Sequence, residues 1–541
     1  MGLDLRWAKC KLLWQNLPED QMPDEVRARF ETLGIQIHFG TTELLGTPIG
    51  TEEDTQVILE QAVVNHRTFF DSIKYGNIPA SVAERLLRLC GVPRMNYITR
   101  TNYPSDLVEA LTTFDLEVQQ TAQLLRQHAR EDEVAPLNYG RLARRRNRQP
   151  FRHAGMGLRS MLSIVDFAFF GSIANCANRI YPSIVALCAV QGRFSRQLEL
   201  TLARINNLTG EDVRGLIPPP ESSGDQCMQF YHEGPGRDME HLQRQLTHSF
   251  ERKAADELFN DSTPAQRATM VASGAPWANT FVCAPLEHML SLPHDNAHRV
   301  YSSLRLGLAP ATLIPGQICF CEHDMTGDPW HFLCCNRLKA TALTYRHDLV
   351  VQTVAEWVRR AGGSTQIEPR GLWAQEDGGL GRRPDIRVVL GGLVFLLDIA
   401  VVHPTTASRL GTPMSMHPLA TEEAMERIKR NRYDGLARLA RASFIPFVVE
   451  TFGGFGACAR RFCSRLARFA EGATREYTRT DLLMGIRSGV ALAVQRGNAD
   501  IIRVGLQRSS NMQTRRWDGI KLRGVRMTLD LRHLARKVVR F

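Results

Sequence analysis

Two aspartates near consecutive apolar runs are the residues of this sequence best suited to hold a catalytic metal. Asp385 follows Arg383-Pro384, and after twelve intervening residues Asp398 lies inside the run Leu393–Val402. Two consecutive strands of this length could bring both carboxylates to one side of a sheet, where they can bind one or two Mg²⁺ ions. An unpaired carboxylate inside an apolar strand is costly, so Asp398 is the most informative residue. The alternative is a solvated strand end or a structural ion pair.

Other polar residues could assist phosphodiester cleavage at such a site. Lys429 and Tyr433 are four residues apart in an expected helix, so they share one face, and either could stabilise charge or supply a proton. Glu368, at the end of an earlier expected strand, is a candidate third acid. Arg346 and His347 open another expected helix, where they either contact phosphate or form a solvated helix start.

A cluster of four cysteines and two histidines falls within the seventeen residues 319–335. Two close thiolates, a spacer of nine residues, and then a histidine and a cysteine can form a tetrahedral Zn²⁺ site. The ligands that this spacing offers are Cys319, Cys321, His331 and either Cys334 or Cys335, with His323 as a competing nitrogen ligand. Buried free thiols are the alternative, but the clustering favours a metal.

The composition indicates a globular protein with a polyanionic partner. The 541 residues carry a net charge of +11, which favours nucleic acid over a membrane, and Arg144, Arg145 and Arg146 form a basic stretch. The 43% hydrophobic and 23% charged content excludes collagen and disorder. No apolar run is long enough to cross a membrane. The N-terminus lacks a secretion-signal pattern, so we expect an intracellular protein without a disulfide framework.

The apolar periodicity predicts the elements that must position these residues. Helical patterns dominate up to about residue 135 and again over 155–206. The character changes after 309, where the sequence predicts a helix, strands, a helix and a strand at 345–361, 364–368, 386–390, 393–402, 421–442 and 444–450. This order predicts an α/β core with its sheet buried between helices.

These motifs together resemble the restriction-like endonuclease of site-specific non-LTR retrotransposons. The resemblance rests on the cysteine–histidine cluster, Arg346-His347, Arg383-Pro384-Asp385, Asp398, Lys429 to Tyr433, and Glu450-Thr-Phe-Gly453. That domain is a variant of the PD-(D/E)XK nuclease fold with a CCHC zinc knuckle in front. The resemblance implies that Asp385 and Asp398 bind the metal and that Tyr433 has a supporting role. Ala400 stands where a lysine is usual, and Lys429 matches the family's displaced lysine.

The N-terminal part resembles the reverse transcriptase of the same elements. Gly2–Cys10 resembles the segment after the polymerase's catalytic aspartates, Leu45–Gly50 the primer grip, and residues 86–101 with Phe114-Asp115 the thumb. A Tyr- or Phe-Ala-Asp-Asp motif does not occur in the sequence. We therefore expect no polymerisation by this chain alone.

The overall expectation is a multidomain protein of the α plus α/β class. The expected parts are a partial reverse transcriptase with a helical thumb (1–135), a helical connection (150–300), a CCHC zinc knuckle (315–345), a PD-(D/E)XK-type restriction-like endonuclease (346–455) and a basic helical C-terminal region (456–541). The expected function is Mg²⁺-dependent nicking of target DNA for target-primed reverse transcription, with Zn²⁺ in the knuckle and a nuclear location. Target DNA and element RNA are the expected partners, contacted by Arg346, His347, Arg383, Arg144, Arg145 and Arg146. The alternative is a catalytically inactive nucleic-acid-binding remnant.

Overall fold

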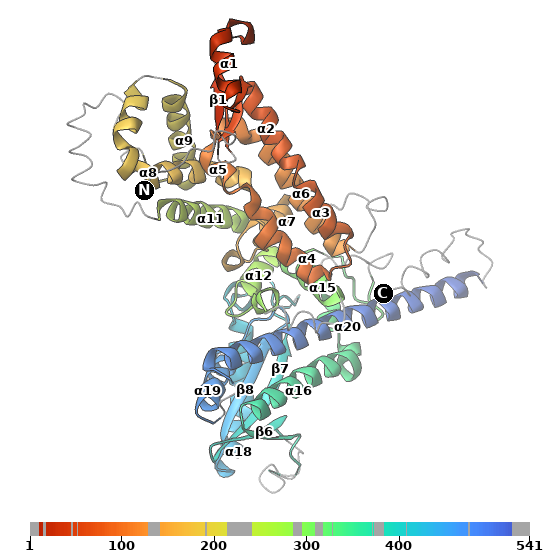
Figure 1. Cartoon of the computed structure of the whole chain (residues 1–541). Coiled ribbons are helices and arrows are strands. Elements are labelled where there is room, and N and C mark those ends of the chain that lie inside the picture. The colour runs from red at the N-terminus through yellow and green to blue at the C-terminus, as the bar shows by residue number, and fades with distance from the viewer. Residues whose placement is uncertain are drawn as a thin grey trace. The chain divides into compact units, whose positions relative to one another are not determined.

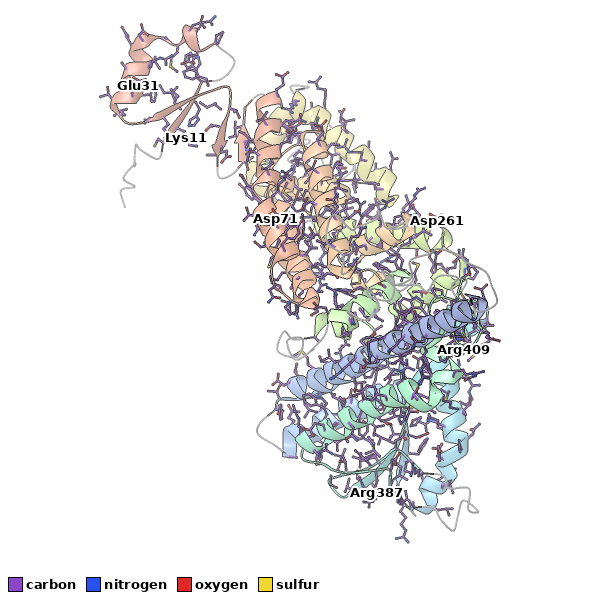
Figure 2. The ribbon with its side chains drawn as sticks, turned by 90° about the vertical axis from the view of Figure 1, so that its right-hand side faces the viewer. Lys11, Glu31, Asp71, Asp261, Arg387 and Arg409 are labelled. Atoms are coloured by element: carbon purple, nitrogen blue, oxygen red, sulfur yellow. The ribbon has the colours of Figure 1, made fainter. Side chains whose placement is uncertain are left out.

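The chain divides into two compact units. The computed structural model describes residues 10–14, 18–44, 47–50, 52–127, 141–189, 192–211, 213, 241–284, 295–308, 318–326, 328–370, 372, 383–406, 408–473 and 477–521. The first unit comprises Met1–Gly76, Leu86–Gln123 and Leu158–Asp256, and the second comprises Asn77–Arg85, Leu124–Gly157 and Glu257–Phe541. Figure 2 draws the described side chains, with Asp71 labelled in the first unit and Arg387 in the second.

Helices dominate both units, and the sheets are small (Figure 1). Up to residue 260 the elements are β1 (Lys11–Trp14), α1 (Asp24–Thr32), β2 (Gln36–Phe39), β3 (Thr42–Leu44), β4 (Thr47–Ile49), α2 (Glu52–Val64), α3 (Arg67–Tyr75), α4 (Ala80–Leu86), α5 (Ile98–Thr101), α6 (Val108–Gln127), α7 (Arg141–Arg148), α8 (Met161–Ala189), α9 (Arg193–Thr209) and α11 (Leu242–Asn260). Beyond it they are α12 (Pro264–Ser273), α13 (Thr280–Cys283), α15 (Asp295–Leu306), the short 3-10 helix η9 (His331–Cys334), α16 (Thr344–Arg360), β5 (Ser364–Ile367), β6 (Ile386–Leu390), β7 (Leu393–Val402), α17 (Pro413–Met416), α18 (Ala420–Leu439), β8 (Ser443–Glu450), α19 (Ala457–Ala473) and α20 (Arg479–Lys521).

The first unit is held by helix packing and by one buried helix cap. β1 pairs with β2 in parallel, and β3 pairs with β4 as an antiparallel hairpin. The rings of Phe70 and Phe114 meet edge to face at 5.6 Å between α3 and α6. Next to Phe114, the Asp115 carboxylate accepts the Met161 backbone N–H at 2.8 Å and the Ser160 hydroxyl. This acid therefore satisfies donors at the start of α8 and complements the positive end of its dipole.

A four-stranded sheet forms the centre of the second unit, in the order β5-β6-β7-β8. β5, β6 and β7 pair in antiparallel fashion, and β7 pairs with β8 in parallel. Gly391 and Gly392 both have positive φ, which lets the chain turn tightly between β6 and β7. Parallel pairing of β7 with β8 requires a crossover, and the segment that carries α18 supplies it.

Helices cover both faces of this sheet. Phe395, Leu397 and Ile399 of β7 point into the core formed with α16, α19 and α20. Leu396 lies on the opposite face and packs with Tyr433 of α18. Because side chains alternate along a strand, Asp398 belongs to the face that carries Leu396. The expected sheet between helices is therefore observed.

A row of glycines on α20 explains how closely it approaches α16. A Cβ atom at Gly485 would come within 2.1 Å of the Trp357 ring, and one at Gly497 within 2.4 Å of the Arg346 side chain. Further along α20, a Cβ at Gly505 would meet the Phe332 ring of η9 at 2.5 Å. The same helix thus contacts both α16 and the cysteine–histidine segment.

The stretch 150–300, expected as a helical connection, is divided between the two units. The expected connection 150–300 contributes α8 and α9 to the first unit, but α12, α13 and α15 to the second. The physical reason is packing: α8 contacts α5 and α9, whereas α13 and α15 contact α20. Among the described helices, none combines the length and apolarity needed to cross a membrane.

Candidate functional site

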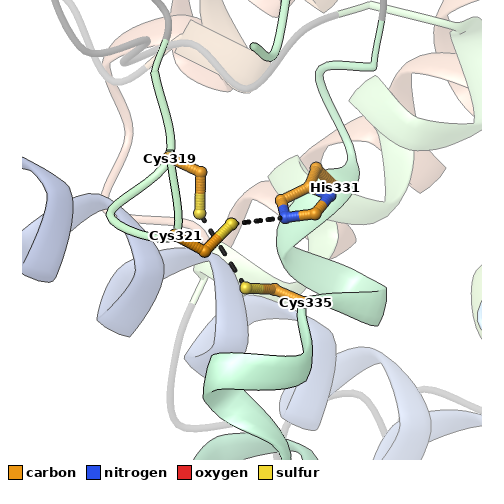
Figure 3. Close-up of side chains that lie close together, drawn as sticks. All are labelled: Cys319, Cys321, His331 and Cys335. Atoms are coloured by element: carbon orange, nitrogen blue, oxygen red, sulfur yellow. Dashed lines mark hydrogen bonds between the residues drawn. The ribbon is translucent and has the colours of Figure 1, made fainter. Parts of the chain in front are cut away.

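Three cysteines and one histidine of the second unit converge on a single point. The ligand atoms of Cys319, Cys321, His331 and Cys335 all lie within 4.8 Å of one another (Figure 3). The Sγ atoms of Cys319 and Cys335 are 3.9 Å apart, and Cys321 Sγ is 3.1 Å from His331 Nε2. Tetrahedral Zn²⁺ with ordinary bond lengths would need about 3.8 Å between two sulfurs and about 3.6 Å between sulfur and nitrogen. The cluster could therefore hold a metal ion, and its donor set fits Zn²⁺.

The sequence left the fourth ligand open between two adjacent cysteines, and Cys335 is the one that joins the group. Cys334 instead directs its thiol to the backbone carbonyl of His331, at 3.3 Å. The competing nitrogen ligand, His323, also lies outside the three-sulfur group. Its ring stacks on that of His331, with 4.0 Å between centroids.

Local backbone geometry positions these ligands. Cys319 donates its N–H to the His323 carbonyl at 2.9 Å, and Glu322 donates to the Cys319 carbonyl at 2.7 Å. Glu322 has φ +74°, which lets the chain reverse between the first two cysteines and the histidine segment. On the other side, η9 presents His331 at its first residue and ends just before Cys335.

A carboxylate lies behind the histidine. Asp328 Oδ2 is 3.7 Å from His331 Nδ1 and 3.4 Å from His323 Nε2. A histidine that binds metal through one ring nitrogen usually has the other oriented by such a group. Sequence analysis missed Asp328, although its place three residues before His331 was the available signal.

Electrostatics in this cluster favour the charged forms of His331 and Cys335, whereas the hydrogen bond to Cys335, together with burial, raises the pKa of the Cys319 thiol. Burial lowers the pKa of His331, but hydrogen bonds to Asp328 and the neighbouring cysteines outweigh burial and raise it. The hydrogen bond from Cys319, followed by contacts that include His331, lowers the pKa of the Cys335 thiol to about 4. Thiolate is the form of cysteine that binds metal.

The second group of candidate residues lies where β5 ends and β6 begins, next to the middle of β7. Ile386 pairs with Leu397, and extending this register by one residue sets Asp385 opposite Asp398. Glu368 lies opposite Asp385 in the same way, because its N–H donates to the Asp385 carbonyl at 2.8 Å. The backbones of these three acidic residues therefore lie side by side on neighbouring strands. The Glu368 side chain itself is exposed and pairs with Arg383 at 3.1 Å.

Each of the two aspartates has a cationic partner. Lys429 of α18 places Nζ 2.5 Å from Asp398 Oδ2 and 3.3 Å from the Ile399 carbonyl. His347 of α16 places Nε2 3.3 Å from Asp385 Oδ2. Asp385 also accepts the Ile399 N–H at 2.5 Å. The two carboxylates, with one lysine and one histidine, therefore come from β7, the start of β6, α18 and α16.

Burial and charge separate the acidities of the two aspartates. Burial raises the pKa of Asp398 to about 6, since the Lys429 charge only partly offsets burial and the Asp385 charge adds to it. Burial also acts on Asp385, but the His347 hydrogen bond and charge outweigh it and lower the pKa. Burial lowers the pKa of His347, yet Asp385 and Asp348 raise it to about 9. A close carboxylate pair with divergent acidities is a common property of functional sites.

Tyr433 lies one turn along α18 from Lys429, inside an apolar cluster. Its ring is 5.2 Å from that of Phe444 and packs with Leu396. The tyrosine is only 6% exposed. These contacts pack α18 against the sheet.

Arg346 does not lie at the surface, unlike the phosphate contact expected for it. Its side chain is buried, and it donates to Asn498 Oδ1 at 2.9 Å and to the Leu333 carbonyl of η9 at 3.4 Å. The Asn498 amide donates in turn to the Thr451 carbonyl at 2.8 Å. Arg346 therefore connects the cysteine–histidine segment with α20 and the end of β8.

The basic stretch on α7 also separates into different environments. Arg144 is exposed, and Arg145 pairs with Asp261 at 2.5 Å. Arg146 is buried, which the helical periodicity of a short basic segment did not reveal. Of these three, Arg144 is the one whose side chain is exposed.

Sequence reasoning missed a buried polar network at the ends of β7 and β8. His403 Nδ1 lies 2.7 Å from the Thr451 hydroxyl, and His403 Nε2 lies 3.0 Å from that of Thr405. Burial lowers the pKa of His403 to about 3, so its ring is neutral. Glu450, next to Thr451, is buried, and this raises its pKa to about 8. The motif Glu450-Thr-Phe-Gly453 was the sequence signal for this region.

Comparison with known proteins adds no relative. No protein-family model matches the chain, and no curated protein is significantly similar to it.

Proposed function

We propose that this chain is a Mg²⁺-dependent DNA endonuclease whose active site is built on Asp385 and Asp398. The observation that carries the proposal is their direct opposition across β6 and β7, with Lys429 Nζ 2.5 Å from Asp398. A buried carboxylate pair with a lysine is the set of groups that metal-assisted phosphodiester cleavage needs. The helix, three strands, helix and strand from α16 to β8 agree with a PD-(D/E)XK-type core.

The donor chemistry of this site fits a hard cation. Carboxylate oxygens of Asp385 and Asp398 are the ligands that Mg²⁺ prefers. The one imidazole described beside them, that of His347, forms a hydrogen bond to the Asp385 carboxylate. Both aspartates would hold the ion, which would supply an activated water and stabilise charge on the phosphate.

The chain's own residues would prepare the site for cleavage. Lys429 would keep Asp398 ionised and present a positive charge beside the phosphate. His347 would orient Asp385 through its Nε2 hydrogen bond, while its other ring nitrogen is 3.1 Å from Asp348. Tyr433 would act as a supporting residue, because its packing on Phe444 fixes the turn of α18 that follows Lys429.

The wider proposal follows from the resemblance in the sequence. We propose that the chain corresponds to the thumb and restriction-like endonuclease of a site-specific non-LTR retrotransposon protein, acting on target DNA and element RNA in the nucleus. The cysteine–histidine cluster ahead of the acidic site supports a Zn²⁺ knuckle in this arrangement. The net charge of +11 supports a nucleic-acid partner.

Nicking of supercoiled plasmid by the purified chain tests the proposal. Mg²⁺ is omitted and then restored, rather than chelated, so that a metal at the cysteine cluster stays bound. We expect nicking that requires Mg²⁺ and falls at least about a hundredfold in Asp398→Asn and Asp385→Asn. The matched control is Glu423→Gln, an exposed acid on α18.

Two results would count against this function. Salt-sensitive DNA binding without nicking would leave the chain as a nucleic-acid-binding remnant. Nicking that survives both aspartate substitutions would place the activity elsewhere, including in a contaminating nuclease.

A further inference from the structure

Two arginines are buried together on α7 and α15, outside both groups described above. Arg146 is 2% exposed and Arg305 is 1% exposed. α7 and α15 contact each other within the second unit. Among the described residues, neither arginine forms an ion pair with an acidic side chain. The interior therefore holds two adjacent positive charges.

Arg305 donates four hydrogen bonds, all of them to neutral acceptors. Its Nε donates to the Gly155 carbonyl at 2.9 Å and its Nη2 to the Phe151 carbonyl at 3.0 Å. Its Nη1 donates to the Ser273 carbonyl at 2.8 Å and to the Tyr301 hydroxyl at 3.1 Å. These contacts fix the guanidinium in place while leaving its charge uncompensated.

Arg146 differs because its guanidinium has no acceptor among the described residues. Within the described part of the chain, Nε, Nη1 and Nη2 of Arg146 are all buried and without a hydrogen-bond partner. Burial, and then the charge of Arg305, lowers the pKa of Arg146 to about 9, so it is still protonated at neutral pH. Buried polar groups are nearly always paired, and one that is not points to an ion or water bound there.

Two glycines lie beside Arg146, and an unpartnered hydroxyl belongs to a residue that binds Arg305. A Cβ at Gly307, where φ is +71°, would lie 3.1 Å from Arg146 Nη1. A Cβ at Gly155, whose carbonyl binds Arg305, would lie 2.6 Å from the Arg146 carbonyl. Ser273, whose carbonyl also binds Arg305, has a buried hydroxyl without a partner. The hydroxyl can donate to an anion that the arginines attract.

We propose that Arg146 and Arg305 form a binding site for a phosphate group. The guanidinium of Arg146 offers a planar set of donors that matches two oxygens of one phosphate, and Arg305 supplies the second charge. Two adjacent positive charges suit a dianion better than a single carboxylate. The phosphate comes either from solution or from the end of a nucleic-acid strand. This inference is independent of the proposed nuclease site, because neither arginine belongs to the carboxylate group of Asp385 and Asp398.

Calorimetric titration of inorganic phosphate into the full chain tests the site. The buffer is free of Mg²⁺, and the ionic strength is matched with chloride. We expect saturable binding of one phosphate, at least about tenfold weaker in Arg146→Met, because charge-assisted hydrogen bonds are lost. Arg141→Met is the matched control, since Arg141 is exposed on the same helix.

Each outcome decides for or against the site. Absence of saturable phosphate binding in the wild-type chain overturns the proposal, as does equal binding by Arg146→Met. If Arg146→Met does not fold, Arg146→Lys is titrated instead, because lysine retains the positive charge but lacks the planar set of donors of a guanidinium. Weaker phosphate binding than in wild type is again expected. A single-stranded oligonucleotide with and without a 5′-phosphate separates the sources. Preference for the phosphorylated strand, abolished by free phosphate, identifies a strand end; equal binding identifies free phosphate.

Discussion

Replacing Asp398 with asparagine should make the metal-free protein more stable at neutral pH. Burial raises the pKa of Asp398 from 3.8 to about 6 even though Lys429 is adjacent. One pKa unit corresponds to about 1.4 kcal/mol, so ionising this carboxyl costs the folded state about 3 kcal/mol. Asparagine has nearly the same shape as the protonated acid and avoids that cost. A residue that lowers the stability of the folded state in this way is expected where its side chain is needed for activity.

The effect has a defined dependence on pH. The folded state keeps its proton on Asp398 up to about pH 6, whereas the unfolded chain loses it near pH 3.8. The folded state therefore binds more protons in this window, and wild-type stability falls as the pH rises through it. Roughly half of the difference should be present at pH 5, and all of it at pH 7.5.

Urea unfolding of wild type and Asp398→Asn in Mg²⁺-free buffer at pH 5 and pH 7.5 measures this difference. Asp434→Asn is the matched control, since Asp434 is a half-exposed acid on α18 that pairs with Arg430 at 3.8 Å; its change should stay within about 0.5 kcal/mol. If Asp398→Asn folds but is less stable than wild type by more than about 1 kcal/mol at pH 7.5, the reasoning is refuted. Asp398 and Lys429 would then be a structural ion pair.

Three further predictions concern other parts of the second unit. Cys335→Ser should release bound zinc and lower the thermal unfolding midpoint, because Cys335 is the member of the adjacent pair that joins the cluster. Cys334→Ser should retain stoichiometric zinc in elemental analysis. Equal loss of zinc in both variants would contradict the assignment. Glu84→Gln should cost about 3–5 kcal/mol in urea unfolding, because buried Arg126 and His298 lose their shared partner; the pKa of Glu84 is lowered by these partners, so this contribution should be present above pH 4.5 and decline as the pH falls. Gly485→Ala should cost about 1–3 kcal/mol through its clash with Trp357, whereas Gly472→Ala, with open space around it, should be neutral or stabilising; similar effects in both would show that α16 and α20 can separate freely.

Much of the α/β core could be predicted because its elements have strong local signals. The strands expected at 386–390 and 393–402 have the observed bounds, and the helix expected at 345–361 is α16. The approach of Asp385 to Asp398 followed from the length of two strands joined by Gly391-Gly392. A short hairpin permits few registers, so sequence spacing translates directly into spatial proximity.

Other features depended on packing that sequence periodicity does not encode. The sequence predicts Arg346 at the start of an exposed helix, but Gly497 lets α20 approach closely and bury the Arg346 side chain. The choice of Cys335 over Cys334 depends on where η9 ends. The partner of Asp385, His347, was expected to contact phosphate, and only the fold shows that α16 brings it to the carboxylate. The contacts of His347 with Asp385 and of Arg346 with Asn498 join residues 38 and 152 positions apart.

The central claim is that a divalent cation binds between Asp385 and Asp398, and Mn²⁺ binding measured by electron paramagnetic resonance tests it most directly. Wild type should bind Mn²⁺ saturably and release it to excess Mg²⁺, with the cysteine-bound zinc retained. Asp385→Asn and Asp398→Asn should each weaken this binding at least about tenfold, while Glu423→Gln should leave it unchanged. Equal Mn²⁺ binding by wild type and both aspartate variants would contradict the account.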